Sequence, residues 1–199
     1  MKDLILLNKK WAAQVTLADC ADDALLEAAK AAGCLYLFVG LESFSDISLH
    51  DAGKQINRVN DYHKIIANIH KHKIMIQAGI VFGFDSDTTE VFQNTLQSCE
   101  QLGIDGVTVS ILTPLPQTPI YDQMKQEDRL LTKDWSCYNG KTHVAFSPKG
   151  MTPQQLYAGY MDFRKRFYSL PSFIKRMRVS RTHIVYNFVI NLGYRLAIR

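Results

Sequence analysis

The feature that limits the fold of this chain most strongly is the alternation of short apolar runs with helical patterns. Four runs rich in β-forming residues span 11–17, 35–40, 74–82 and 106–112, and helical patterns follow the first three at 22–32, 61–72 and 88–102. Alternation at this spacing predicts right-handed βαβ units, which build a parallel sheet. The last three runs are almost continuously apolar, as expected of strands covered on both faces. The predicted fold class is therefore α/β, with four βα units.

Residues with strong preferences for helix ends support these boundaries. Asp22 and Thr88 are predicted N-caps. Gly33 and Gly103 follow two of the helical patterns, where a C-terminal cap needs positive φ.

The βα pattern stops after the fourth run. Residues 113–121 hold three of the six prolines, which predicts an ordered or extended loop. Helices are predicted at 120–127 and from Thr152, with Pro153 at the first helical position, to residue 168. A complete eight-unit barrel needs about 250 residues, so a chain of 199 residues cannot hold one.

Ligands of parallel α/β folds bind at the carboxyl ends of the strands. Glu42 directly follows the second apolar run. Its carboxylate is expected either to bind the amine or hydroxyl groups of a ligand or to cap the next helix, and both interpretations stay open. Gly79 and Gly83 permit close approach of a ligand to the backbone, and a bulge or tight turn is the alternative. Asp85 and Asp87 are interpreted as helix-start residues rather than catalytic acids.

Cysteine and histidine spacing predicts no metal site. No two of the four cysteines form CxxC, CxxxC or CxxH, and the six histidines show no metal-binding spacing. His70 and His72 lie near a predicted helix end and are interpreted as structural. With no signal peptide and no apolar stretch near 20 residues, we expect a cytoplasmic protein with reduced thiols.

Taken in order, the strand ends resemble a known family. The segments QVTLADCADDALLEAAKAAGCLYLFVGLES, IQAGIVFGFDSDT and ILTPLPQTPIYDQM are similar to the later half of a radical S-adenosylmethionine (radical SAM) core, in particular to the subgroup with an N-terminal cobalamin-binding domain. The resemblance covers nearly the whole chain. It implies the third to sixth strands of a partial TIM-type barrel in residues 1–127, followed by a helical, basic C-terminal extension over 128–199.

The resemblance also implies cofactors and site residues. In that family a [4Fe-4S] cluster bound at CxxxCxxC reduces S-adenosylmethionine (SAM) to a 5′-deoxyadenosyl radical, which abstracts a hydrogen from substrate. The residues implied to bind SAM are Gln14, which would face the SAM side of the barrel, Glu42 and Ser43 at the methionyl or ribose part, and Gly79, Val81 and Gly83 near the adenine.

Several family features are missing from this sequence. Ser86 stands where the family has an acid, and Gln117 replaces the glycine of the sixth-strand loop. The CxxxCxxC motif and the first two strands are absent. We therefore expect that the chain does not cleave SAM alone, and that the cluster and cobalamin belong to a full-length or complemented form. A truncated reading frame, a split subunit whose partner is the cluster-bearing N-terminal half, and a degenerate remnant all stay open.

The last 37 residues differ in charge from the rest. Residues 163–199 carry nine Lys or Arg and no acid, whereas residues 1–162 carry 14 basic and 19 acidic residues. The segment also holds an apolar stripe flanked by arginines, at Ile184, Val185, Phe188, Val189, Leu192 and Leu196. We expect this stripe to dock on the core while the arginines are solvated.

Other roles for the basic segment remain open. A basic amphipathic helix also suits peripheral contact with a membrane surface or an acidic partner, which would make the chain a non-catalytic interaction module. No nucleic acid is expected as a partner, because no reader motif accompanies the charge. The substrate, a small molecule or a lipid, cannot be read from the sequence. An unpaired first strand predicts poor solubility or dimerisation.

Overall fold

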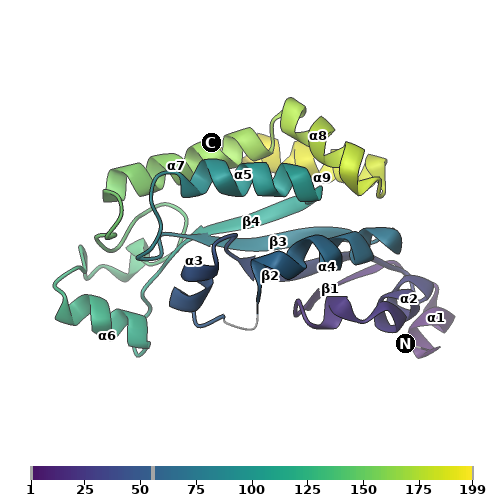
Figure 1. Ribbon diagram of the computed structural model, residues 1–199, viewed down its shortest axis with the longest axis horizontal. Coiled ribbons are helices and arrows are strands. Elements are labelled where there is room, and N and C mark those ends of the chain that lie inside the picture. The colour runs from purple at the N-terminus through teal and green to yellow at the C-terminus, as the bar shows by residue number, and fades with distance from the viewer. Residues whose placement is uncertain (1, 55–56, 199) are drawn as a thin grey trace.

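The computed structural model describes residues 2–54 and 57–198. Four parallel strands form one sheet in the order β1-β2-β3-β4 (Figure 1), which confirms the α/β prediction. The strands are β1 (Trp11–Val15), β2 (Cys34–Glu42), β3 (Met75–Phe82) and β4 (Gly106–Ile111).

Helices follow and flank these strands. They are α1 (Lys2–Leu7), α2 (Asp23–Ala31), α3 (Asp46–Asp51), α4 (Val59–Lys71), α5 (Val91–Leu102), α6 (Pro119–Gln126), α7 (Pro153–Phe167), α8 (Leu170–Ser180) and α9 (Ile184–Ala197), with 3₁₀ turns η1 (Asp19–Ala21) and η2 (Trp135–Cys137). The short helix α3 was not predicted from the sequence. It follows the carboxyl end of β2 and lies beside the loops at that edge of the sheet.

The sheet has one covered face and one open face. Alternate side chains of β2, such as Leu37 and Val39, are buried against the helices, whereas Tyr36 and Phe38 on the opposite face are only half-buried. Helices α4, α5 and α7 lie on the covered face (Figure 1). Strand pairing lines up Gly40, Gly79 and Thr108 in one row across the sheet. This row of the open face therefore consists of small residues.

Helix caps were predicted well at some ends and wrongly at one. The Asp22 side chain accepts the backbone N–H groups of Ala24 and Leu25, and Gly103 ends α5 with φ +69°. Thr152 and Gln155 form a capping box at the start of α7. The prediction that Thr88 caps the third helix is wrong: α5 begins three residues later, after a turn in which the Val91 N–H donates to the Thr88 carbonyl.

The aspartates before α5 also differ from expectation. Asp87 is buried and accepts the backbone N–H groups of Gly83 and Phe84, so it closes the turn after β3. Asp85 pairs with Arg129. Neither residue starts a helix, because the Asp87 carboxylate is used in the turn after β3 and the Asp85 carboxylate is used in ion pairs.

The C-terminal helix contradicts the docking prediction. The six stripe residues of α9 are between 42% and 76% exposed, and the buried residues of this helix are Asn187 and Asn191. Polar anchors beneath the helix decide its rotation, as described below. The buried core contains residues from both sides of the proposed boundary at residue 127, such as Phe82 and Phe163, and that boundary stays a prediction.

Candidate functional site

A pocket of about 510 Å³ opens at the carboxyl ends of β2, β3 and β4. It is lined by Glu42, Asp51, Ala52, Gly53, Lys54, Val81, Phe84, Leu112, Pro119, Ile120 and Gln123. The walls combine apolar side chains from β3, α6 and the loops with a few charged groups. This mixture, at this edge of a parallel sheet, suits a ligand that has both apolar and polar parts.

Glu42 is the acidic residue of the pocket that comes from the sheet itself. Its backbone lies in the left-handed region, with φ +65°, where the pairing of β2 with β3 shifts register. The Tyr62 hydroxyl donates to the carbonyl of Leu41 at 2.7 Å and contacts that of Ser43 at 3.2 Å, which holds the chain on either side of Glu42. The carboxylate is partly exposed, and Lys54 Nζ lies 3.7 Å from its Oε1. Glu42 is thus a carboxylate held at the pocket and open to a ligand cation or hydroxyl.

Neighbouring side chains occupy the space that a Cβ would fill at Gly40 in β2 and at Gly79 in β3. A Cβ on Gly79 would lie 3.0 Å from Cζ of Phe38, so the missing side chain lets the Phe38 ring rest on the sheet. A Cβ on Gly40 would lie 2.6 Å from Oε1 of Glu42. These two glycines therefore allow Phe38 and Glu42 to adopt their positions on the open face.

The structure brings together only some of the residues implied to bind SAM. Glu42 and Val81 line the same pocket, and Gly79 lies two residues before Val81 on the same face of β3. Gln14 is exposed on the open face of β1, opposite Phe38 in register. All four lie on the open side of the sheet.

Ser43 and Gly83 lie away from the pocket lining. Ser43 is buried, and its hydroxyl accepts the N–H of Ser45. Gly83 has φ +106°, and a Cβ there would lie 2.8 Å from Cδ2 of the core residue Leu156. Contact of these two residues with SAM stays a prediction.

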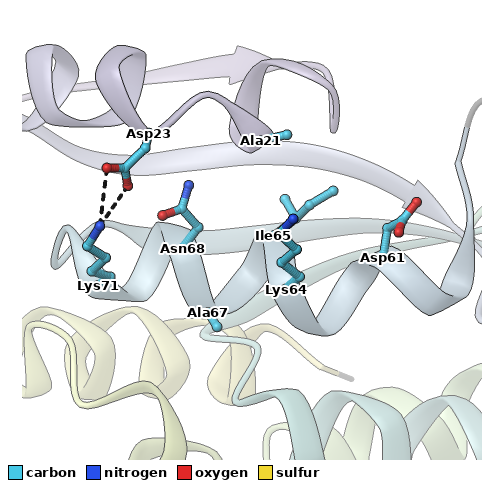
Figure 2. A pocket seen from close by; sticks show the side chains of 8 residues that line it. All are labelled: Ala21, Asp23, Asp61, Lys64, Ile65, Ala67, Asn68 and Lys71. Atoms are coloured by element: carbon cyan, nitrogen blue, oxygen red, sulfur yellow. Dashed lines mark hydrogen bonds and ion pairs between the residues drawn. The ribbon is translucent and has the colours of Figure 1, made fainter.

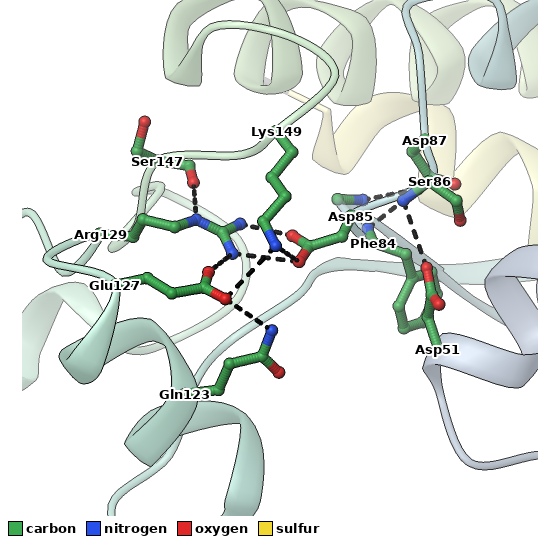
Figure 3. Close-up of polar contacts among 11 residues, drawn as sticks. Asp51, Phe84, Asp85, Ser86, Asp87, Gln123, Glu127, Arg129, Ser147 and Lys149 are labelled. Carbon is green, nitrogen blue, oxygen red and sulfur yellow. Dashed lines mark hydrogen bonds and ion pairs between the residues drawn. The ribbon is translucent and has the colours of Figure 1, made fainter.

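An ionic cluster that the sequence did not reveal borders the pocket (Figure 3). Arg129 pairs with Asp85 and, at 2.6 Å, with Glu127, while Lys149 lies 3.1 Å from Asp85. Burial raises the pKa of Asp85, but its hydrogen bonds with Arg129 and Lys149 outweigh burial, so the net shift is downward. Gln123 lines the pocket and donates to Glu127. The cluster fixes the loop after β3 against the segment after α6.

A hydrogen-bonded group closes the other end of the open face. Gln77 accepts from the Tyr36 hydroxyl and donates to Thr108 at 2.7 Å and to Tyr194 of α9 at 3.1 Å. Tyr194 also stacks on Tyr168, with ring centroids 5.0 Å apart. Helix α9 therefore bounds the open face where the strands begin, opposite the pocket.

The described residues do not hold an iron–sulfur cluster. No group of three or more His, Cys, Asp or Glu side chains in 2–54 and 57–198 could hold a metal ion. Cys20, Cys34 and Cys99 are buried, and burial raises the pKa of the Cys20 thiol to about 12. A cluster needs several thiolates close together, so these cysteines do not fit one.

A larger pocket, of about 600 Å³, lies elsewhere (Figure 2). It is a groove between the η1–α2 segment and α4, in the helical layer on the covered side of the sheet. Lys71 bridges to Asp23 across one end at 2.9 Å. The groove contains none of the residues at the strand ends, so we place the candidate site at the smaller pocket. His70 and His72 bond Asp105 and Asp23, which confirms their structural interpretation.

Comparison with known proteins shows which proteins this chain is similar to. Over 187 residues the chain is 32% identical to bacteriochlorophyllide d C-12(1)-methyltransferase of Chlorobaculum tepidum, with 93% of this chain and 40% of that protein covered. It is 28% identical to hopanoid C-2 methylase of Rhodopseudomonas palustris over 172 residues, which cover 86% of this chain and 31% of that protein.

A solved structure shows the same fold. The radical SAM methyltransferase TsrM of Kitasatospora setae, determined with cobalamin and a [4Fe-4S] cluster bound, matches with a TM-score of 0.56 and 15% identity. The match covers 83% of this chain and 34% of that one. The chain is therefore similar in sequence to these two methylating enzymes and similar in fold to a radical SAM methyltransferase. The expected resemblance is confirmed.

Three further findings describe this chain. Residues 118–188 match a domain of unknown function, DUF4070. The chain spans 40% or less of the length of the two curated relatives compared above and of TsrM. None of the helices in the described ranges is long and apolar enough to cross a membrane.

Proposed function

We propose that this chain forms the SAM-binding later strands of a radical SAM methyltransferase, and that residues outside it hold the [4Fe-4S] cluster. The observation that carries the proposal is the convergence of Glu42 and Val81 on one pocket at the carboxyl ends of the strands. The named activities of the relatives support methyl transfer as the parent reaction. Cobalamin belongs to the complemented form, and the methyl acceptor stays open between a small molecule and a lipid.

Four residues of the pocket have a proposed partner in SAM. The Glu42 carboxylate would accept hydrogen bonds from the ribose hydroxyls or the amino group, because charge-assisted hydrogen bonds are strong in a partly buried site. Val81, Phe84 and Leu112 offer apolar contact to the adenine. Gln14, Gly79, Gly83 and Ser43 remain proposed contributors from the family resemblance.

The Glu42→Gln variant tests this assignment by SAM binding. A hydrogen bond to a charged group contributes about 1.5–3 kcal/mol, so we expect SAM affinity, measured by isothermal titration calorimetry, to fall by about tenfold or more. Glu27→Gln, an exposed glutamate of α2, is the matched control and should bind like the parent chain. Equal affinity of the two variants would remove Glu42 from the SAM site.

Reconstitution tests the proposed division of labour. The chain is co-expressed with a polypeptide that carries CxxxCxxC and the first two strands of the fold, and 5′-deoxyadenosine is measured. Product from the pair, and none from either part alone, is the expected result. No product together with no SAM binding by the pair would contradict an active two-part enzyme.

A further inference from the structure

Helix α9 presents an apolar face away from the rest of the protein. Its most exposed residues are Val185 at 76%, Leu196 at 73% and Val189 at 62%. Five other large apolar or aromatic residues of this helix are more than one-third exposed: Ile184, Tyr186, Phe188, Leu192 and Tyr194. Patches of this kind mark contact surfaces rather than ordinary solvent-facing helices.

Buried polar anchors fix the helix in this orientation. Asn187 Nδ2 donates to the buried carboxylate of Asp105 at 2.8 Å. Asn191 donates to the Asp105 carbonyl at 2.9 Å and accepts from the buried Arg176 at 2.8 Å. Turning the apolar face inward would break these bonds and remove the Asn187 and Asn191 amides from Asp105 and Arg176, and lost hydrogen bonds to buried charges are costly. The outward face is therefore a built feature of the fold.

A cluster of cations lies at the start of the same helix. Lys30 Nζ contacts the Lys73 carbonyl at 3.4 Å, and Lys73 Nζ contacts the Arg181 carbonyl at 3.5 Å, three residues before α9. Burial, with Lys10 and Lys73 nearby, lowers the pKa of Lys30. Burial, together with Lys30 and Lys10, lowers the pKa of His183, the residue directly before α9. These cations form the α9 basic cluster: Lys10, Lys30, Lys73 and Arg181.

The α9 basic cluster is not neutralised within the described part of the protein. None of its four members forms an ion pair with a carboxylate of residues 2–54 or 57–198. Like charges held together without a counter-charge favour an anionic partner. The same partner has to accept the adjacent apolar face.

We propose that α9 and its basic cluster dock this protein on an anionic lipid bilayer surface. Apolar side chains of an interfacial helix enter the boundary between headgroups and acyl chains, and nearby cations meet lipid phosphates. Nucleic acid would satisfy the cations and leave the valines and leucine exposed, so it fits the surface less well. The opposite edge of the sheet, with the candidate pocket, stays clear of the bilayer contact. The inference does not depend on SAM binding.

Vesicle flotation of the full chain tests the proposal. Vesicles of phosphatidylcholine alone are compared with vesicles of phosphatidylcholine and phosphatidylglycerol, at low and high salt. Binding to the anionic vesicles only, weakened by salt, is the expected result. No binding, or equal binding to both kinds of vesicle, would overturn the proposal.

Paired variants separate the apolar and charged contributions. Val185→Ser with Val189→Ser should lower binding at least about tenfold, since each substitution removes an apolar contact with the acyl chains. Lys10→Gln with Lys73→Asn should lower it about fivefold for each charge removed. Leu131→Ser and Lys141→Gln, exposed residues of the segment after α6, are the matched controls and should bind like the parent.

Further outcomes are decisive as well. Circular dichroism checks that each variant folds, and Leu196→Ser provides a second apolar substitution near the end of α9. Parent-like binding by the valine pair and by Leu196→Ser would overturn the proposal. So would a stable dimer that the valine pair dissociates while no vesicle binding is seen, or binding of tRNA without binding of vesicles. SAM affinity, measured in parallel, reports on the proposed function separately.

Discussion

Buried charges at single residues decide which surfaces this protein exposes. Asp105, at the start of β4, accepts from the Ile76 N–H, the hydroxyls of Ser180 and Thr182, and the amide of Asn187. Arg176 is fully buried with its guanidinium 3.8 Å from the Phe167 ring centroid, and burial lowers its pKa to about 10. These donors and acceptors hold α8 and α9 on the sheet, because leaving any buried charge without partners costs stability.

The ionic cluster around Arg129 makes stability depend on pH. Hydrogen bonds from Arg129 and Gln123 lower the pKa of Glu127 to about 2, from an ordinary value of 4.5. A carboxyl whose pKa is lower in the folded than in the unfolded protein stabilises the fold at pH values above its unfolded-state pKa. That stabilisation is lost as the pH falls toward the folded-state pKa. We therefore expect Glu127→Gln to lower the urea midpoint at neutral pH and to match the parent near pH 2. Glu90→Gln, exposed and outside the cluster, should show no such pH-dependent difference; a constant difference for Glu127→Gln would contradict the assignment.

At the scale of elements, close packing overrides helix propensity in α7. This helix begins with the Thr152 capping box and buries Leu156, Phe163 and Phe167 in the core. Gly159 lies in its interior, where glycine is normally unfavourable. A Cβ on Gly159 would lie 2.1 Å from Cε2 of Phe92 in α5. The glycine thus lets α5 and α7 pack together.

Two glycine substitutions distinguish packing from propensity. Gly159→Ala should lower the free energy of unfolding by about 1–3 kcal/mol, because the methyl group collides with Phe92. Gly193→Ala in α9 meets nothing within 4 Å and should raise it by up to about 1 kcal/mol. Urea denaturation of both variants measures the effect. Stabilisation by both substitutions would show that α5 and α7 can separate without cost.

At the scale of the whole molecule, the sheet is open on one face and has a free edge at β1. Strand β1 pairs with β2, and the four-strand order places it at the edge of the sheet. Its residues Ala12 and Gln14 are exposed. Unpaired strand edges template pairing with another chain, so the prediction that the chain self-associates still stands.

A charge on this edge should reduce self-association. Ala12→Lys places an ammonium group on an exposed position of β1, which discourages edge-to-edge pairing. We expect sedimentation velocity to show a smaller average mass than for the parent chain. Ala24→Lys, an exposed alanine of α2, is the control and should sediment like the parent. If both variants match the parent, association does not use β1.

Local sequence signals predicted most of the fold and part of the candidate site. Each strand was located within a few residues because continuous apolar runs are typical of parallel strands. The expectation that both faces are covered fits β3, whereas one face of β2 is only half-buried. Glu42 was found because a carboxylate directly after such a run lies at the functional edge of the sheet. Arg129 and Lys149 could not be found, since their partner Asp85 is more than forty positions away in sequence from Arg129.

The sequence by itself determined the α/β class, the resemblance to radical SAM methyltransferases and the lack of the CxxxCxxC motif, because each depends on local patterns and short motifs. Only the tertiary structure decided which face of α9 is buried. Apolar periodicity alone favoured an inward stripe, although Asn187 and Asn191 share one face at a spacing of four residues. Their partners Asp105 and Arg176 lie directly before β4 and within α8, and the observed rotation of α9 satisfies these buried charges and leaves the valines exposed.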